Sequence, residues 1–193
     1  MDINKTVFEY FNKEKKREAG RYRATDLYKI KKGDLTPENY FKNVKVDWDG
    51  ISNMFPGMAY ESMLNEIFRN HVNIWQQSKY EIDIAEGIKL VFVTDYELPN
   101  MIIEAKFPTR FREEICEWHK DQCEIQYRGT GKDVYQLQFL GRDDIKKYKK
   151  LCIIYKYKPS VVRWNNIQKT LINFHKDLIS WQTKKKLSSK QAR

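Results

Sequence analysis

Two neighbouring stretches of the chain are almost wholly apolar and rich in β-branched residues. The first runs from Ile88 to Thr94 and the second from Met101 to Phe107, and the short connection between them contains Pro99. A near-continuous apolar strand has both faces covered, so a chain with two of them needs helices packed on either side of a sheet. This pair of strands therefore predicts a layered α/β fold.

The spacing of apolar residues elsewhere predicts the elements that surround these strands. Helical periodicity is strongest after Pro56-Gly57, and apolar residues that alternate with charged ones indicate a further strand before Ile88. In chain order, the elements predict a small mixed central β-sheet flanked by helices. Helices are expected over residues 58–75, 112–127 and 161–181, and further strands over residues 80–84, 134–140 and 151–157.

We expect a single domain of 193 residues, because the chain contains no internal repeat and no low-complexity linker. Residues 1–55 are expected to form a helical cap or clamp, residues 56–182 the core, and residues 183–193 a basic, frayed tail. In the first segment, Tyr22 and Tyr40 are among several rings interleaved with Lys and Arg. This pattern suits a path for single-stranded nucleic acid, and it suits an amphipathic cap equally well. Helices are expected over residues 5–17 and from residues 25 and 37, with a turn at residues 47–50.

The charge of the chain favours a polyanionic partner. It has 36 Lys and Arg against 26 Asp and Glu, a formal net charge of +10. Neutralising phosphates releases counterions, which favours binding of nucleic acid, although excess charge also serves solubility alone. The sequence shows no apolar core of a signal peptide, no run long enough to span a membrane, and three cysteines without a CxxC motif. We therefore expect a cytoplasmic protein without a membrane partner.

One carboxylate follows the first apolar strand, and another lies inside the second. Asp95 comes directly after Thr94, and Glu104 precedes Lys106 by two positions. At the end of a hairpin, Asp95 and Glu104 can lie side by side, where their charges repel unless a cation lies between them. Carboxylate oxygens suit Mg²⁺ and Mn²⁺, and Lys106 points to the same side as Glu104 by strand alternation. Such a group suits hydrolysis of a phosphate ester.

An exposed Glu-x-Lys pair at the edge of a sheet is the plainer explanation of the same residues. Here, however, Ile103 and Ala105 flank Glu104, so the charges fall within a strand that is apolar on both faces. Charged side chains in a central strand need a reason. The sequence therefore favours the functional interpretation.

Four short motifs carry a family resemblance over about residues 57–180. They are Gly57-Met58-Ala59-Tyr60-Glu61, Val93-Thr94-Asp95, Ile102-Ile103-Glu104-Ala105-Lys106 and His119-Lys120-Asp121-Gln122. With these motifs the chain resembles the PD-(D/E)xK nuclease superfamily, in the RecB-like branch that includes lambda-type exonucleases and CRISPR-associated nucleases. The resemblance implies a restriction-endonuclease-like core with a helical N-terminal addition, Mg²⁺ or Mn²⁺ as cofactor, and DNA as partner.

The resemblance also implies roles for single residues. The first core helix of such families supplies a residue that binds the metal or its water, and here that position is Glu61, which could equally be an exposed helix carboxylate. The implied catalytic residues are Asp95, Glu104, Lys106 and Gln122, and the implied metal ligands are Glu61, Asp95, Glu104 and the Ala105 carbonyl.

The chain departs from the family pattern in two respects. The RecB-like pattern places a Tyr four residues after the motif Gln, and this chain has Gln126 there, with Tyr127 one position later. The iron–sulfur members need four cysteines that bracket the core, whereas this chain has three, so no cluster is expected.

Together these inferences predict a metal-dependent deoxyribonuclease that acts on single-stranded DNA or DNA ends in replication, repair or recombination. A viral or mobile-element origin would place it in a host cytoplasm. Lys184, Lys185 and Lys186 are expected to bind nucleic acid, unless they form a merely solvated end. Two other functions remain open: a non-catalytic nucleic-acid-binding protein that keeps the nuclease fold, and a virion or assembly protein that uses only its basic surface.

Overall fold

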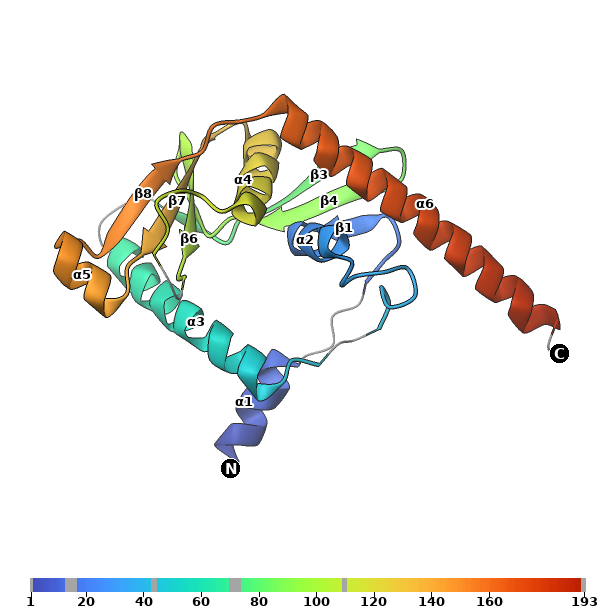
Figure 1. Cartoon of the computed structure of the whole chain (residues 1–193), viewed down its shortest axis with the longest axis horizontal. Coiled ribbons are helices and arrows are strands. Elements are labelled where there is room, and N and C mark those ends of the chain that lie inside the picture. Colours follow the sequence, from blue (N-terminus) through green and yellow to red (C-terminus); the bar gives the residue numbers. More distant parts are fainter. Residues whose placement is uncertain (1, 13–16, 43–44, 70–73, 109–110, 192–193) are drawn as a thin grey trace.

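Helices cover two small β-sheets in the computed structural model of the chain (Figure 1), which describes residues 2–12, 17–42, 45–69, 74–108 and 111–191. In chain order the elements are α1 (Ile3–Phe11), β1 (Arg21–Arg23), α2 (Ala24–Lys32), α3 (Trp48–Arg69), β2 (Trp75–Gln76), β3 (Lys79–Ala85), β4 (Ile88–Val93), β5 (Tyr96–Glu97), β6 (Met101–Lys106), α4 (Glu117–Thr130), β7 (Asp133–Phe139), α5 (Arg142–Tyr148), β8 (Cys152–Lys156) and α6 (Val161–Gln191).

The strands are divided between two sheets. Sheet A contains three strands in the order β1-β4-β3, and sheet B contains five in the order β2-β5-β6-β7-β8. Strand β6 lies at the centre of sheet B, antiparallel to β5 and parallel to β7. The predicted α/β class with a small mixed sheet is confirmed. The two apolar strands of the sequence, β4 and β6, nevertheless belong to different sheets.

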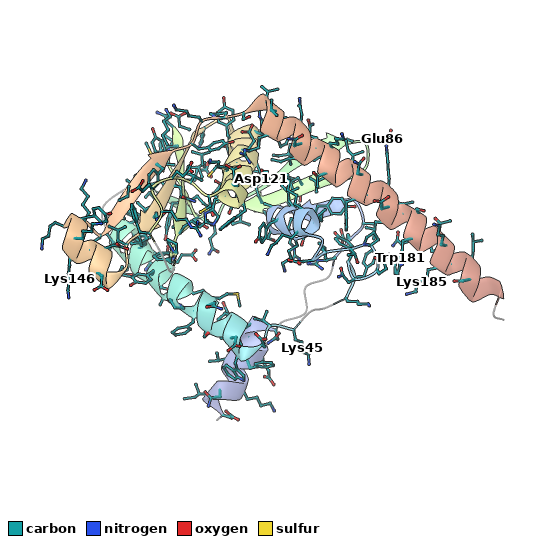
Figure 2. All side chains as sticks on the ribbon, viewed as in Figure 1. Lys45, Glu86, Asp121, Lys146, Trp181 and Lys185 are labelled. Atoms are coloured by element: carbon teal, nitrogen blue, oxygen red, sulfur yellow. The ribbon has the colours of Figure 1, made fainter. Side chains whose placement is uncertain are left out.

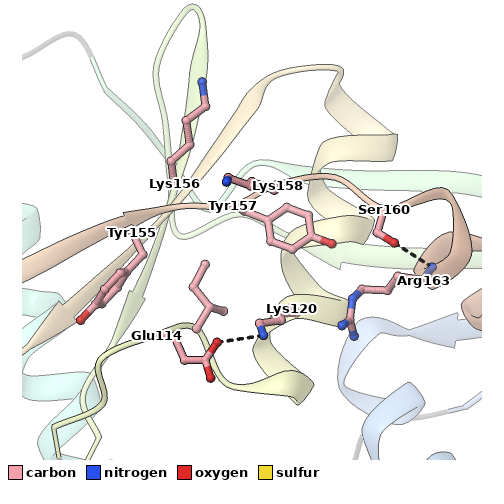
Figure 3. A pocket seen from close by; sticks show the side chains of 9 residues that line it. Glu114, Lys120, Tyr155, Lys156, Tyr157, Lys158, Ser160 and Arg163 are labelled. Carbon is pink, nitrogen blue, oxygen red and sulfur yellow. Dashed lines mark hydrogen bonds and ion pairs between the residues drawn. The ribbon is translucent and has the colours of Figure 1, made fainter.

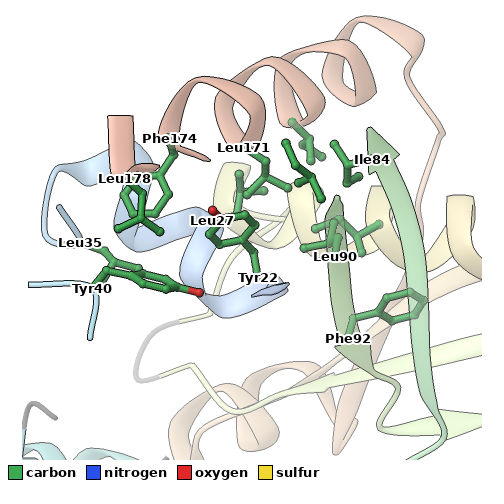
Figure 4. Packing of buried hydrophobic residues seen from close by; sticks show 13 residues of the cluster. Tyr22, Leu27, Leu35, Tyr40, Ile84, Leu90, Phe92, Leu171, Phe174 and Leu178 are labelled. Carbon is green, nitrogen blue, oxygen red and sulfur yellow. The ribbon is translucent and has the colours of Figure 1, made fainter. Parts of the chain in front are cut away.

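The apolar faces of the strands are covered by helices, as their composition requires. The inner face of sheet A packs against α2 and α6 (Figure 4). In sheet B, Ile102 packs with Cys123 of α4, whereas Ala105 packs with Leu64 of α3. Ile102 and Ala105 point to opposite faces of β6 by strand alternation. The central strand therefore lies between two helices, with Ile102, Glu104 and Ala105 buried and the other residues half-buried.

Helix α3 is longer than the sequence pattern predicts. It begins at Trp48, where a turn was expected, and passes through Pro56. Asp47 accepts a hydrogen bond from the Gly50 amide at 2.8 Å and so satisfies the first turn of the helix. Pro56 lacks an N–H, but its fixed φ is compatible with a helix. The proline therefore lies inside α3 and does not mark its start.

The N-terminal segment is part of the core and not only a helical cap. Its strand β1 pairs in parallel with β4, and Tyr22 and Tyr40 are fully buried. These two rings therefore cannot stack on bases. Helices α1 and α2 lie where helices were expected, although residues 13–16 of the first lie outside the described residues. The residues after Pro37 form turns, where a second helix start was expected.

The C-terminal half differs from the prediction mainly in its helices. Helix α4 begins at Glu117, five residues later than expected, α5 was not predicted, and α6 continues through residues 183–191, where a frayed tail was expected. The end of α6 projects beyond the rest of the molecule (Figure 1). Within the described ranges, no helix is long and apolar enough to cross a membrane.

Candidate active site

Asp95 and Glu104 meet where β5 pairs with β6. Tyr96 of β5 lies opposite Ile103 of β6, so one further step of the same antiparallel register sets Asp95 opposite Glu104, on the same face of the sheet. The Ala105 amide donates a hydrogen bond to Asp95 Oδ2 at 2.8 Å, which fixes that carboxylate beside β6. The sequence predicted the meeting of the two carboxylates, but it assigned the hairpin to β4 and β6 because it did not reveal β5.

The Glu104 carboxylate is fully buried and accepts three hydrogen bonds. Lys106 Nζ donates to Oε1, and Gln122 Nε2 donates to the same oxygen at 2.5 Å. Gln126 Nε2 donates to Oε2. Gln122 and Gln126 lie four residues apart on α4, so they share one face of the helix. The predicted catalytic residues Glu104, Lys106 and Gln122 are thus brought together by β6 and α4.

Gln126 is the member of this cluster that the family pattern did not identify. Its side chain is fully buried, and its Oε1 has no hydrogen-bond donor among the described residues. Turning the amide over would set this oxygen against the Glu104 carboxylate, so the hydrogen bond to Glu104 decides the orientation of the amide. The helical spacing from Gln122 was the sequence signal that could have placed Gln126 in the site.

The charges in the cluster are not balanced. The pKa of Asp95 lies well above the ordinary range of a carboxyl group, chiefly because Asp95 is buried and next because Glu104 is negatively charged; Lys106 and the Ala105 amide oppose the shift. Burial lowers the pKa of Lys106, but the charges of Glu104 and Asp95 outweigh it and raise the pKa. One ammonium therefore faces two carboxylates, and the cluster favours an added proton or cation.

Glu61 of α3 approaches the same carboxylates from the side. It is half-buried, and its carboxylate accepts a hydrogen bond from Gln77 Nε2 at 3.2 Å. The backbone N–H of Gln77 donates to the Asp95 carbonyl at 3.3 Å. The Tyr96 hydroxyl donates to the backbone carbonyl of Glu61 at 3.2 Å. The charge of Glu61 contributes to the raised pKa of Asp95. Glu61 therefore lies beside the cluster and adds to its negative charge.

The donor set suits one hydrated divalent cation. Among the residues that the structure describes, no three His, Cys, Asp or Glu side chains are grouped closely enough to hold a metal ion by themselves. Mg²⁺ is usually bound by one or two carboxylates, because waters and substrate phosphates fill the remaining positions. Asp95 and Glu104 supply two. The N–H and C=O of one strand residue point to the same side, so the Ala105 carbonyl faces Asp95 as well.

His119 lies next to the cluster but contributes no charge. Burial and, to a smaller extent, the positive charges of Lys106 and Arg112 lower its pKa to about 3. Its Nδ1 lies 2.9 Å from Gln136 Nε2 of β7, with which it forms a hydrogen bond. The ring is therefore a neutral group held between α4 and sheet B.

The lysines of the C-terminal segment lie away from the cluster. Lys184, Lys185 and Lys186 are exposed on the last turns of α6, and Lys185 Nζ lies 5.0 Å from the centre of the Trp181 ring (Figure 2). Helix α6 runs past sheet A, and its C-terminal end points away from sheet B (Figure 1). These predicted nucleic-acid-binding residues are not brought to the carboxylates.

A pocket of about 360 Å³ lies beside the start of α4 (Figure 3). Two of the cations that line it, Lys120 and Arg163, form ion pairs with Glu117, each at 2.7 Å. Lys120 also pairs with Glu114 at 3.2 Å. Neither Asp95 nor any residue that contacts Glu104 lines this pocket. The pocket is therefore separate from the carboxylate cluster, and its charges are largely neutralised.

No protein-family model matches the chain, and no curated protein matches it in sequence. Solved structures do match its fold. The crystal structure of SSO0001 matches with a TM-score of 0.62 and 16% identity, over 94% of this chain and 87% of that one. An alkaline exonuclease from Laribacter hongkongensis, LHK-Exo, matches with a TM-score of 0.60, and its complex with dAMP with 0.63. Both matches to LHK-Exo have 11% identity over 98% of this chain and 100% of that one.

At these identities the likeness shows a shared fold. It extends over nearly the whole chain, including the N-terminal segment that adds β1 to sheet A. The α/β core predicted from the sequence is thus confirmed as the fold of a known exonuclease. The chain shares the fold of LHK-Exo, and its carboxylate cluster lies where β5 and β6 meet.

Proposed function

We propose that the chain is a metal-dependent deoxyribonuclease that hydrolyses phosphodiester bonds, with single-stranded DNA or DNA ends as its substrate, in replication, repair or recombination. The observation that carries the proposal is the pairing of Asp95 with Glu104 beside Lys106, in a cluster with excess negative charge. The nuclease fold supports it. So does the crystal structure of LHK-Exo with dAMP, since a nucleotide bound to a chain of this fold is consistent with a nucleic-acid substrate here.

In this proposal Asp95, Glu104 and the Ala105 carbonyl hold Mg²⁺ or Mn²⁺, and Glu61 orients water beside them. Bound there, the cation supplies positive charge that polarises the phosphate and favours loss of a proton from water. Burial and, next, the charge of Glu104 raise the pKa of Asp95, and both would favour a cation between the two carboxylates. Gln122 and Gln126 hold Glu104 in position.

Lys106 acts on the reacting groups. Hydrolysis forms a bond between the water oxygen and phosphorus and breaks the bond from phosphorus to the leaving sugar oxygen. The attacking water gives up a proton to solvent, and the leaving sugar oxygen takes one up from solvent to become a hydroxyl. The Lys106 ammonium, whose pKa is raised, donates hydrogen bonds to the attacking water or to the charge that develops on the phosphate. When Lys106 turns toward substrate, Gln122 and Gln126 still bind Glu104, so the carboxylate keeps its place.

The direct test is cleavage of linear, circular, single-stranded and double-stranded DNA by the purified chain in Mg²⁺, Mn²⁺, Ca²⁺ or EDTA. We expect cleavage in Mg²⁺ or Mn²⁺ only, and its loss in Asp95→Asn and in Glu104→Gln. Asp177→Asn is a matched control, because Asp177 is an exposed carboxylate on α6. Binding of DNA without cleavage in any metal would instead assign a non-catalytic nucleic-acid-binding protein, and equal cleavage by all four proteins would exclude the site.

A further inference from the structure

The outer face of sheet A carries more cations than carboxylates: Arg21, Arg23, Lys79 and Lys89 against Glu81 and Asp83. Tyr22 of β1, Leu90 of β4 and Ile82 of β3 lie side by side in register and point into the core. Their neighbours along each strand point to the opposite face. Arg23 of β1 and Lys79 of β3 therefore share the outer face, and Arg21 lies on it as well.

This outer face continues to Asp95. Lys79 pairs with Val93, and beyond them the Thr94 amide donates to the Ser78 carbonyl at 3.0 Å and the Gln77 amide to the Asp95 carbonyl at 3.3 Å. A strand rises about 3.3 Å per residue. Lys79, Arg23 and Arg21 lie in register with residues two, four and six positions before Asp95. Their distances from Asp95 along the strands are therefore about 6.6 Å, 13 Å and 20 Å.

The charged residues line a hollow of about 300 Å³, formed by Arg17, Glu18, Arg21, Arg23, Lys79 and Val91. Four cations and one carboxylate line the hollow, and two of the cations also pair with carboxylates beside it. Arg17 is held by Asp26 at 3.0 Å and by the Tyr40 carbonyl at 2.9 Å, and Arg21 pairs with Glu81. These contacts orient the guanidinium groups before any ligand binds, which lowers the entropy lost on binding.

We propose that this hollow binds internal backbone phosphates of the DNA strand whose scissile phosphate lies at Asp95 and Glu104. The proposal rests on the proposed function for the position of the scissile bond. The cations are spaced along the sheet much as successive phosphates are spaced along an extended single strand. Contacts to sugar and phosphate carry no sequence information, so the hollow would bind strands of any sequence. The strand would run across the outer face of sheet A, and the hollow would set its path into the carboxylate cluster.

The test is binding of a labelled single-stranded oligonucleotide in Ca²⁺ across a series of salt concentrations. For single strands, each lost phosphate contact lowers the log–log salt slope by about 0.7, so Lys79→Ala and Arg21→Gln should each lower it by about that amount. Glu18→Gln removes the one carboxylate of the hollow and should tighten binding, an effect that a damaged fold cannot produce. Lys169→Ala is the control, because Lys169 is exposed on α6, the helix that covers the inner face of sheet A.

An unchanged slope in both Lys79→Ala and Arg21→Gln, or weaker binding by Glu18→Gln, would overturn the proposal. An equal loss in Lys169→Ala would also overturn it, since binding would then follow net charge and not this face. Because the readout is binding, a wild-type chain that binds DNA without cutting it still tests the hollow. Failure of the nuclease proposal and failure of this one are therefore distinguishable.

Discussion

At the level of single residues, the raised pKa of Asp95 makes the stability of the fold depend on pH. Burial and the charge of Glu104 raise this pKa, so the folded protein keeps the proton to a higher pH than the unfolded chain. Unfolding releases the proton between the ordinary and the raised pKa, and stability therefore falls as pH rises through that window. Asp95→Asn removes the titrating group while its amide oxygen can still accept from Ala105.

We therefore expect Asp95→Asn, without divalent cations, to unfold at a higher temperature than the wild type at neutral pH and to show a flatter pH dependence. Saturating Mn²⁺ should stabilise the wild type and leave Asp95→Asn little changed. Thermal melts from about pH 5 to pH 9, with and without Mn²⁺, measure both effects. A variant no more stable than the wild type at neutral pH would contradict the raised pKa.

The ion pair between Lys106 and Glu104 is expected to matter for both stability and turnover. The Lys106 side chain is 22% exposed and Glu104 only 1%, so this is not the surface ion pair that the sequence alone allowed. Lys106→Met leaves a buried carboxylate without its cation, which costs about 3 kcal/mol. Turnover should fall about 100-fold or more, because a preorganised donor is lost. Chemical denaturation and single-turnover cleavage of the same variant separate the two effects.

Gln126 should behave as a positioning residue for Glu104. Gln126→Met keeps the side-chain volume but removes the hydrogen bond to Oε2, and the buried unpaired Oε1 disappears with it. We expect metal affinity or activity to fall about 10- to 100-fold, as when other supports of metal ligands are removed. Stability should fall by about 1–3 kcal/mol, because the buried Oε2 of Glu104 loses a donor. Titration of Mn²⁺ binding checks this, and Gln122→Met should act in the same direction. Wild-type affinity in Gln126→Met would assign the amide to packing alone.

At the level of elements, two glycines test how closely the helices pack on the strands. A Cβ at Gly57 of α3 would lie 3.8 Å from Phe107 Cδ2, an ordinary contact, whereas a Cβ at Gly129 of α4 would overlap the Phe92 ring. Gly57→Ala should stabilise the fold by about 0.5–1 kcal/mol, because Gly weakens a helix interior. Gly129→Ala should destabilise it by about 1–3 kcal/mol through overpacking. Urea unfolding of both variants gives the two signs; stabilisation by Gly129→Ala would show that α4 and sheet A are not packed so tightly.

At the level of the whole molecule, the length of α6 separates the basic C-terminal segment from the active site. The helix has 31 residues, which is about 46 Å, and its free end points away from sheet B (Figure 1). Deleting residues 184–193 should leave cleavage of a short oligonucleotide unchanged. Binding of a long strand should lose up to about 3.5 units of salt slope, about 0.7 for each of the five Lys and Arg residues that the deletion removes. Salt titrations with a short and a long strand check this, and equal losses on both would place the tail at the cleavage site.

The order of residues in the chain determined which strands are buried and which side chains share one side of a strand. Continuous apolar composition marked β4 and β6 as buried strands, and strand alternation set Glu104 and Lys106 on one side, because both properties depend only on neighbours in sequence. The same local rules did not reveal β5, because it has only two residues. They also missed the part of α3 that precedes Pro56, where capping by Asp47 and tertiary packing outweigh the tendency of proline to lie at a helix terminus.

Only the tertiary structure decided which sheet each strand joins and which groups surround Glu104. The parallel pairing of β1 with β4, which makes the N-terminal segment part of the core, depends on contacts between residues far apart in sequence. The donation from Gln126 and the raised pKa of Asp95 likewise arise from the packing of α4 and β5 against β6. The sequence determined which side chains could bind a cation. Burial, a property of the folded chain as a whole, decided how strongly their charges act on one another.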